Sequence, residues 1–385
     1  MHIYFDHAAT TTMVEPAIAA LTNQIKKLGD ASSLHTAGRS VRKDLEQARE
    51  EIAKTVDCLP SEVVFTATGT EANNLAIKGL FWNGAKLGRK VIITSTFEHH
   101  AVADPILWLK EHEGAQVIEI DVDRSGFVNL ERLANEVAQH KDQVALISIM
   151  HANNEVGTVQ DIAKVVKIAG DIPVHSDCVQ SFGKIELSFK KLALTAATIS
   201  AHKIGGPLGV AALILKKGLD IEPVLHGGGQ ERDLRSGTFN APGIIAFAAA
   251  ATNAMANRVE RELKVRELKG ELMQSIKKNV PTSWINGDQV NTLPGILSVT
   301  FPKTDSEGLL LLLDSEGFAC STGSACTAGV QRPSHVLMAM GLSEDEATST
   351  LRFSLSYTNT INEIAKLSSV IATVVARSIA ASGKR

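Results

Sequence analysis

Lys203 stands where a predicted strand must end in a turn. The apolar run at 196–199 predicts a short buried strand, and two glycines and a proline at 205–207 predict the turn. An ammonium group among small residues is poorly solvated, so its pKa falls and more free amine is available to attack a carbonyl group. The alternative is an ordinary surface lysine after a strand, and this segment alone does not separate the two.

Strands and helices alternate along the first two-thirds of the chain. Apolar runs predict strands at 62–65, 90–94, 116–120, 144–150, 172–176, 196–199 and 208–215. Helices are predicted at 16–28, 40–56, 75–82, 102–111, 130–139 and 162–169. This alternation predicts an α/β fold with a mostly parallel, seven-stranded sheet and helices on both faces.

The pattern changes toward the C-terminus. One long helical stretch over 241–278 is predicted to link two domains. Beyond it, strands at 296–301 and 351–356 and helices at 306–315 and 361–381 predict a smaller α+β domain. We therefore expect an N-terminal arm (1–15) that packs with the small domain, a large domain (16–255) and a small domain (256–385).

Polar residues collect at the predicted C-terminal ends of the strands, where parallel sheets bind ligands. They are Gly69, Thr70, His99, Asn154, Asp177, Gln180 and Lys203. The small and hydroxyl residues at 66–74 precede a helix, which predicts a phosphate site at the helix N-terminus. The alternatives are a plain N-cap by Thr68 or Thr70 and, for His99, a capped or solvated histidine.

Asp177 follows an apolar strand, where a carboxylate is costly unless it has a partner. A protonated pyridine nitrogen is such a partner, because the aspartate keeps the ring an electron sink for carbanions. Together with Lys203, this predicts pyridoxal 5'-phosphate bound to the lysine as a Schiff base. An aspartate that caps a helix is the alternative.

A segment at 320–329 carries two thiols, Cys320 and Cys326, among eight small residues. Such a segment can carry a nucleophile between a buried site and an outside acceptor, although cysteine in a Gly/Ser turn is often structural. We expect Cys320 to be buried. Arg352 interrupts an apolar strand, which predicts either a clamp on a substrate carboxylate or an internal acidic partner.

The composition argues against several classes of protein. The net charge is -3 with acids and bases mixed, so no nucleic-acid or polybasic surface is expected. The longest apolar run, 244–251, is too short for a membrane span, and the N-terminus lacks the pattern of a signal peptide. The cysteines lack the spacing of a metal site. We expect a cytoplasmic protein with free thiols and no metal.

With these residues assembled, the chain resembles the cysteine desulfurases over 4–377. These are fold-type I pyridoxal-phosphate transferases of the class V aminotransferase group. The resemblance rests on the segments at 201–203, 226–232, 235–238 and 324–326. The segment at 333–337 is similar to the nitrogen-fixation and iron–sulfur-cluster type.

The resemblance implies a role for each matching residue. Lys203 would hold the cofactor, His99 would stack on its ring and act in acid–base steps, and Cys326 would take the substrate sulfur as a persulfide. The cofactor would contact Gly69, Thr70, His99, Asn154, Asp177, Gln180, Ser200, His202, Lys203 and, from the partner subunit, Thr238. Asn154 and Arg352 would hold the substrate carboxylate.

The implied activity converts L-cysteine to L-alanine and passes the sulfur to an acceptor protein for iron–sulfur clusters, thio-cofactors or tRNA thiolation. A homodimer is implied as well. A selenocysteine lyase or transaminase on the same fold would not need Cys326. A non-catalytic homologue that binds a sulfur carrier would tolerate loss of Lys203. Departures at Asp30, Ala31, Phe97, Cys178, Ala201, Gly205 and Leu208 bear on partner choice and turnover, and leave the catalytic groups in place.

Overall fold

The larger part of the molecule is built on one central sheet. The computed structural model describes residues 2–323 and 333–382. The sheet has seven strands in the order β2-β8-β7-β6-β5-β3-β4. They are β2 (Val63–Thr66), β3 (Val91–Ser95), β4 (Gln116–Ile120), β5 (Val144–Ser148), β6 (Val174–Asp177), β7 (Ala196–Ser200) and β8 (Ala211–Leu215). All neighbours are parallel except that β8 is antiparallel to β2 and β7. The predicted mostly parallel sheet is confirmed.

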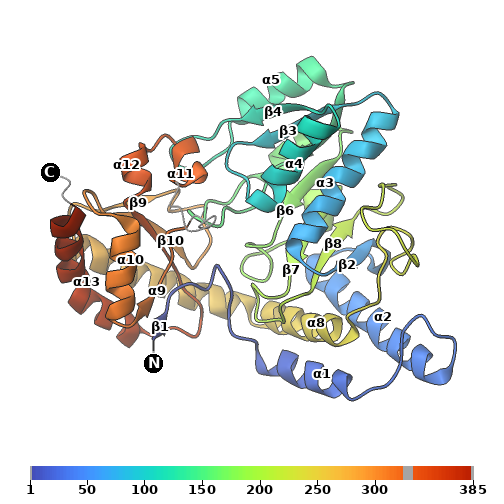
Figure 1. Cartoon of the computed structure of the whole chain (residues 1–385), viewed down its shortest axis with the longest axis horizontal. Helices are drawn as coiled ribbons and strands as arrows, with labels where there is room; N and C mark the ends of the chain where they lie inside the picture. Colours follow the sequence, from blue (N-terminus) through green and yellow to red (C-terminus); the bar gives the residue numbers. More distant parts are fainter. Residues whose placement is uncertain (1, 324–332, 383–385) are drawn as a thin grey trace.

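Helices cover both faces of this sheet (Figure 1). Strand residues alternate between the two faces, so Phe65 and Ile93 enter one core while Val64 and Ile92 enter the other. The second core is covered by α3 (Gly69–Lys86) and α4 (His100–His112). The first is covered by α1 (Glu15–Ile25), α2 (Thr36–Val56), α5 (Leu130–His140), α6 (Ile162–Ala169), α7 (Phe189–Leu192) and α8 (Ala241–Ala256).

The smaller part has its own antiparallel sheet, in the order β12-β10-β9. Its strands are β9 (Trp284–Asn286), β10 (Ile296–Thr300) and β12 (Thr350–Ser354). Its helices are α9 (Arg258–Asn279), α10 (Ser306–Ser315), α11 (His335–Ala339), α12 (Glu344–Ala347) and α13 (Ile361–Ser382). The strands, α9, α10 and α13 enclose a separate apolar core.

The N-terminal arm joins the two parts. Its strand β1 (Ile3–Tyr4) pairs in parallel with β11 (Phe318–Ala319), and Phe5 is buried in the smaller core. Farther along, the Val14 N–H donates to the Gly205 carbonyl beside the large sheet, at 2.9 Å. The arm therefore spans the junction at which the predicted site lies. The predicted domain limits remain a prediction.

The predicted helical stretch over 241–278 is helical except at Asn257, where the chain breaks into α8 and α9. The Asn257 side chain donates to the Asn253 carbonyl at 2.8 Å, and its own N–H also bonds that carbonyl. Asparagine side chains compete with helical hydrogen bonds in this way. The break allows α8 to pack on the large sheet and α9 on the small one.

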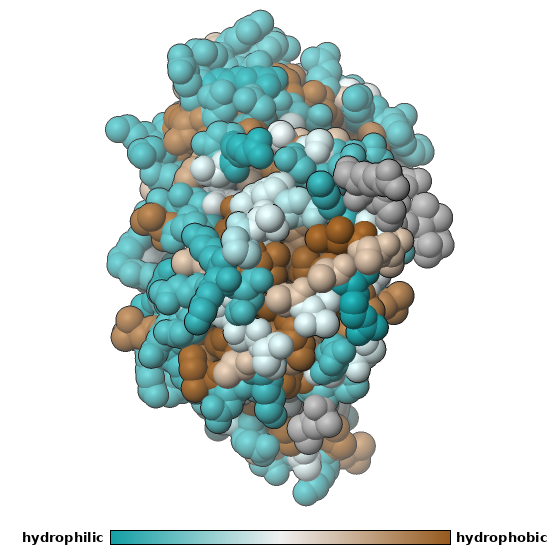
Figure 2. Space-filling model, turned by 90° about the vertical axis from the view of Figure 1, so that its left-hand side faces the viewer, coloured by the Kyte–Doolittle hydropathy of each residue, from teal (hydrophilic) through white to brown (hydrophobic). Residues whose placement is uncertain are grey.

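One described helix, α13, has the length and apolar content of a membrane span. Its side chains Ile364, Leu367, Ile371 and Val374 are buried in the smaller core. Figure 2 looks onto the side of the molecule where α13 lies and shows hydrophobic residues interspersed with hydrophilic ones. The helix is a core element of the smaller part, and the predicted absence of membrane contact stays a prediction.

A buried ion pair fixes the segment at 226–238 to the large sheet. Arg49 on α2 donates to both carboxylate oxygens of Glu231, at 2.8 and 2.9 Å, and to the Val63 carbonyl at 2.7 Å. The two side chains are only 3% and 1% exposed. The guanidinium also lies 4.7 Å from the ring centre of Phe65. The pair therefore anchors the segment that carries Thr238.

We predict that Arg49→Met lowers the free energy of unfolding by about 3–5 kcal/mol, because it leaves the Glu231 carboxylate buried without its partner. The double variant with Glu231→Leu should recover much of that loss. Urea denaturation measures both. Arg132→Met is the control, since its ion pair with Asp121 is exposed and should contribute less than about 1 kcal/mol. If Arg49→Met and Arg132→Met lowered the free energy of unfolding by equal amounts, the account would be contradicted.

Candidate active site

A cavity of about 500 Å³ lies between the two parts, at the C-terminal ends of the sheet strands. Ten of the twelve residues predicted for the site line it: Gly69, Thr70, His99, Asn154, Asp177, Gln180, Ser200, His202, Lys203 and Arg352. Thr238 is exposed and does not line it. Cys326 lies outside the described residues. Ten predicted residues that are far apart in the sequence therefore line the same cavity.

The Lys203 amine is held at the wall of this cavity by the N-terminal arm. Its Nζ donates to the carbonyls of Ala8 and Ala9, each at 2.6 Å. Burial, and next the charge of Arg352, lower the pKa of Lys203 to about 8, although Asp6 and Asp177 oppose this. A lysine with this pKa is partly unprotonated near neutral pH and can act as a nucleophile toward a carbonyl.

Asp177 is the last residue of β6, and each of its carboxylate oxygens accepts one hydrogen bond. One accepts from Asn73 Nδ2 at 2.8 Å and the other from the Val179 N–H at 2.9 Å. Asn73 comes from α3, and sequence reasoning missed it because the contact joins residues distant in the chain. The carboxylate is therefore fixed in orientation and still borders the cavity.

Helix α3 points its N-terminus at the cavity. It starts at Gly69, six residues before the predicted start at position 75, because Thr68 Oγ1 accepts from the Glu71 N–H at 3.0 Å and caps it. A Cβ atom at Gly69 would lie 3.2 Å from Val179 Cγ2, so the turn packs closely on its neighbour. The unpaired N–H groups of this first turn suit an anion.

Arg235 is paired with an acidic residue of its own chain. Its Nε donates to Glu71 Oε1 at 2.6 Å, and the same carboxylate accepts from the Ala67 N–H. The guanidinium is thereby committed to an internal acid. It ties the segment at 226–238 to the first turn of α3.

His99 both caps a helix and lines the cavity. Its Nδ1 accepts from the Ala101 N–H at 3.0 Å, at the start of α4. Burial lowers the pKa of the ring, and the charge of Asp177 partly opposes this. The ring is therefore neutral near pH 7, and because Nδ1 is an acceptor the proton lies on Nε2.

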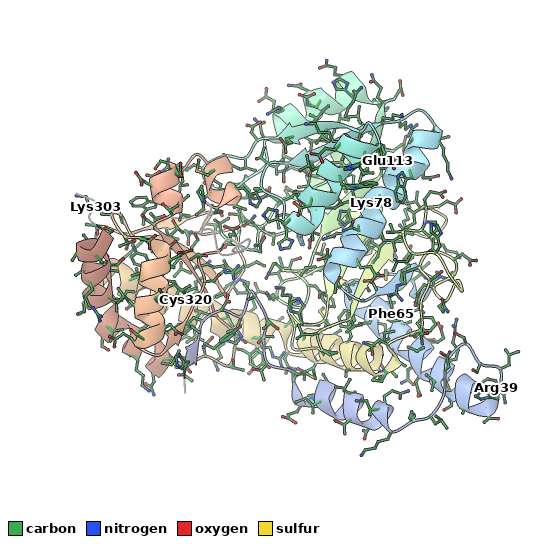
Figure 3. The ribbon with its side chains drawn as sticks, in the orientation of Figure 1. Arg39, Phe65, Lys78, Glu113, Lys303 and Cys320 are labelled. Carbon is green, nitrogen blue, oxygen red and sulfur yellow. The ribbon has the colours of Figure 1, made fainter. Side chains whose placement is uncertain are left out.

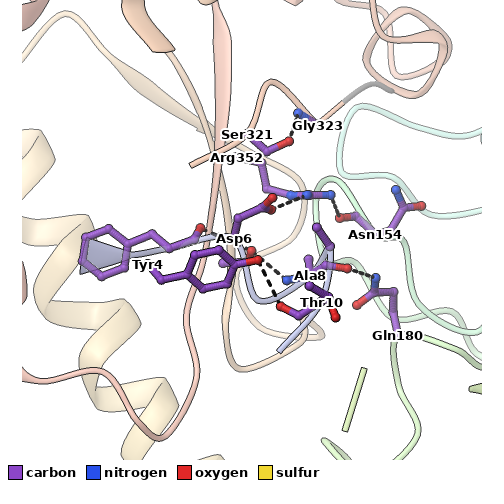
Figure 4. A network of polar contacts seen from close by, with 12 residues as sticks. Tyr4, Asp6, Ala8, Thr10, Asn154, Gln180, Ser321, Gly323 and Arg352 are labelled. Atoms are coloured by element: carbon purple, nitrogen blue, oxygen red, sulfur yellow. Dashed lines mark hydrogen bonds and ion pairs between the residues drawn. The ribbon is translucent and has the colours of Figure 1, made fainter. Parts of the chain in front are cut away.

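Arg352 has the internal acidic partner that was the alternative to a substrate clamp (Figure 4). Its Nη2 donates to Asp6 at 2.7 Å, and its Nη1 donates to the Asn154 carbonyl at 3.0 Å. Arg352 Nε and Asn154 Oδ1 are buried without a partner among the described residues. Since unpaired buried polar atoms are costly, these two atoms are candidates for ligand contacts.

The described thiols are poor nucleophiles. Cys320 is buried in the smaller part, as predicted (Figure 3), and burial raises its pKa. Burial raises the pKa of both Cys58 and Cys178 to about 12. Because the thiolate is the reactive form, these three side chains are inert near neutral pH.

Two buried carboxyl groups beside the site were missed by sequence reasoning. Glu98 Oε1 accepts from Ser95 Oγ at 2.5 Å and the Met150 N–H at 2.9 Å. Burial raises its pKa to about 8. Glu155 lines the cavity, accepts from Ser334 Oγ at 2.5 Å, and also has a raised pKa because it is buried. The signal in the sequence was that each acid neighbours a predicted site residue, since Glu98 precedes His99 and Glu155 follows Asn154.

We predict that Glu98→Gln removes a pH dependence of stability. The Glu98 pKa is about 8 in the folded chain against 4.5 ordinarily, so between these values the folded chain binds the extra proton. Wild-type stability should therefore fall as pH rises through this window, by up to about 1.4 kcal/mol per unit. The glutamine mimics the protonated acid and should not show the fall.

Urea denaturation at several pH values measures this effect, with the exposed Glu113→Gln as the control. The control should follow the wild type. If Glu98→Gln and the wild type lose stability in parallel, the buried acid is not protonated as inferred.

Known proteins share this fold and are similar in sequence. The chain matches the aminotransferase class-V family model over residues 3–367. The "IscS-like cysteine desulfurase" of Mycobacterium tuberculosis is 44% identical over 379 residues, which cover 97% of this chain and 96% of that protein.

Two solved structures are similar over nearly the whole chain. A "NifS-like protein" is 35% identical with a TM-score of 0.91, covering 98% of this chain and 100% of that one. A structure described as "SspA in complex with cysteine" is 32% identical with a TM-score of 0.80, covering 93% and 99%. The chain therefore belongs to the class V aminotransferase family and, within it, to the cysteine desulfurases.

Proposed function

We propose that this chain uses pyridoxal 5'-phosphate to convert L-cysteine to L-alanine and holds the released sulfur on Cys326. The observation that carries the proposal is one cavity that joins a nucleophilic lysine, a fixed carboxylate and a helix N-terminus. These groups match the aldehyde, the pyridine nitrogen and the phosphate of the cofactor. The cavity volume of about 500 Å³ also suits a small ligand together with its cofactor.

Each end of the cofactor has its protein groups in this proposal. Lys203 holds the aldehyde carbon, and Asp177, fixed by Asn73, pairs with the pyridine nitrogen. The first turn of α3, with Ser200 and His202, receives the phosphate. When bound, pyridoxal phosphate supplies the carbonyl and the electron-withdrawing ring.

The contact to the substrate carboxylate comes from Arg352 Nε, which is a donor, whereas Asn154 Oδ1 can only accept and suits a donor group of a ligand. Arg352 Nε faces no partner among the described residues, and its orientation is fixed by Asp6 and the Asn154 carbonyl. The guanidinium can therefore bind an acid without losing its internal partner. A structure described as SspA with cysteine supports cysteine as the substrate by analogy.

The protein residues move the protons. The Lys203 amine takes the α-proton of the substrate, because its pKa of about 8 leaves it partly unprotonated. His99 carries its proton on Nε2, and its Nδ1 is occupied by the Ala101 N–H, so in this state the ring faces a ligand as a hydrogen-bond donor.

Sulfur transfer is a displacement at the substrate sulfur. The Cys326 thiolate attacks that sulfur, an S–S bond forms, and the C–S bond breaks. The electron pair of the broken bond goes to carbon, which takes up a proton and leaves as L-alanine. The persulfide is then passed to an acceptor protein. The described thiols are all protonated near neutral pH, which supports Cys326 as the acceptor of sulfur.

The proposal includes a homodimer located in the cytoplasm. Thr238 is exposed and lies outside the cavity of its own chain, although the family motif gives it a phosphate contact. The Arg49–Glu231 and Arg235–Glu71 pairs hold its segment to the large sheet. This supports a contact of Thr238 with the cofactor of a second subunit.

We predict equal release of sulfide and L-alanine from L-cysteine when a reductant is present. Cys326→Ala and Lys203→Ala should each lose both products, because the C–S bond breaks only when the Cys326 thiolate attacks the sulfur of a substrate bound through the cofactor on Lys203. Cys58→Ala is the matched control, since that thiol is half-buried away from the cavity, and it should keep both. Product assays with purified holoenzyme measure this.

Two results would contradict the proposal. Full activity of Cys326→Ala on selenocysteine or in transamination, with no sulfide from the wild type, would favour the lyase or transaminase. Retained turnover in Lys203→Ala would remove the lysine from the chemistry.

A further inference from the structure

A second cavity, of about 380 Å³, lies on the other side of the N-terminal arm. Lys203 and Ala8 line both cavities, so the arm and the lysine form the partition between them. The second cavity also contains Lys184, which is half-buried and belongs to none of the predicted roles. Lys184 and Lys203 therefore both line the second cavity.

A chain of hydrogen bonds connects these two lysines. Lys184 Nζ donates to Gln180 Oε1 at 2.9 Å, and Gln180 Nε2 donates to the Ala8 carbonyl at 2.9 Å. That carbonyl also accepts from Lys203 Nζ at 2.6 Å. The Ala8 carbonyl oxygen therefore accepts one hydrogen bond from the Gln180 amide and one from the Lys203 ammonium.

The Lys184 ammonium determines which way the Gln180 amide points. An ammonium can only donate, so it must face the amide oxygen, and the carbonyl of Ala8 can only accept, so it must face the amide nitrogen. Gln180 also lines the cofactor cavity. In this orientation the second amide proton remains available to a ligand oxygen there.

The backbone holds this arrangement closely against the Lys203 segment. Gly183 has a φ of +71°, and a Cβ atom there would lie 2.8 Å from Ile204 Cγ2. Only glycine suits both constraints. The turn that carries Lys184 is thus packed on the residue that follows Lys203.

Other charges around the two lysines have fixed partners or a fixed protonation state. Arg352 and Asp6 form an ion pair. Burial lowers the pKa of His7 and His202 to about 4, so both rings are neutral. In the second cavity Arg258 pairs with Glu262, Arg261 bonds Asn253, and Glu15 lines the rim. Burial, followed by the charge of Lys203, lowers the pKa of Lys184 to about 7, so its charge changes near neutral pH.

We propose that Lys184 is a positioning residue for Lys203, acting through Gln180 and the Ala8 carbonyl, and that its charge tunes the lysine from the second cavity. This inference rests on the proposed role of Lys203. Lys184 touches neither the cofactor cavity nor the reacting atoms, so it acts through its neighbours.

Two variants of Lys184 separate position from charge. Lys184→Gln should weaken cofactor binding about tenfold, because the shorter glutamine amide can both donate and accept and so no longer fixes the orientation of the Gln180 amide. Lys184→Arg keeps a side chain that can only donate and should recover the affinity. Cofactor fluorescence in equilibrium titrations measures both. Lys269→Met is the matched control, because Lys269 is a buried lysine that also has a lowered pKa but lies outside this chain of hydrogen bonds.

The charge is tested without cofactor, by pH-dependent acetylation of Lys203 followed by peptide mass spectrometry. The wild-type midpoint should lie at about 8. Arginine keeps its charge where Lys184 loses it, so Lys184→Arg should lower the midpoint by about one unit, and Lys184→Gln should not. Lys269→Met should leave it unchanged.

Equal Lys203 midpoints in the arginine and glutamine variants would overturn the inference, as would wild-type affinity in Lys184→Gln. If Lys184→Gln does not fold, Lys184→Arg alone tests the inference. A Lys203 acetylation midpoint in Lys184→Arg that is no lower than in the wild type would also overturn it. The acetylation result concerns the free amine, so it stands apart from any failure of the chain to bind the cofactor.

Discussion

The Lys203 ammonium, bound to two main-chain carbonyls and shielded from water, is the interaction on which the site depends. Desolvation brings its pKa down to about 8, and the carbonyls of Ala8 and Ala9 keep the group in one place. A free lysine would be protonated and mobile. The fold thus supplies both the ionisation state and the position that attack on a carbonyl requires.

This interaction explains why the N-terminal arm crosses the molecule. The arm begins as a strand of the smaller part, places Asp6 against Arg352, and then presents its carbonyls to Lys203. One short segment therefore aligns a substrate-binding candidate from the small sheet with a nucleophile from the large one. Movement of one part relative to the other would alter both groups together.

Much of the fold was predictable from sequence because strands and caps have local signals. The seven strands follow from apolar runs in the sequence. The location of the site, at the C-terminal ends of these strands, follows from the rule that parallel sheets bind ligands there. The break at Asn257 and the early start of α3 were missed, since both depend on side-chain hydrogen bonds that periodicity does not report. Asn73, Glu98 and Lys184 were missed because their importance lies in burial and in contacts far apart in the chain.

The most direct test of the account is to reduce the cofactor-loaded enzyme with borohydride and map the modified peptide. Reduction fixes the cofactor on whichever amine holds it. The account predicts the label on Lys203 alone, with none on Lys184 although that amine lies behind the same wall and also has a lowered pKa. A label on Lys184, or a loaded enzyme with no labelled lysine, would contradict it.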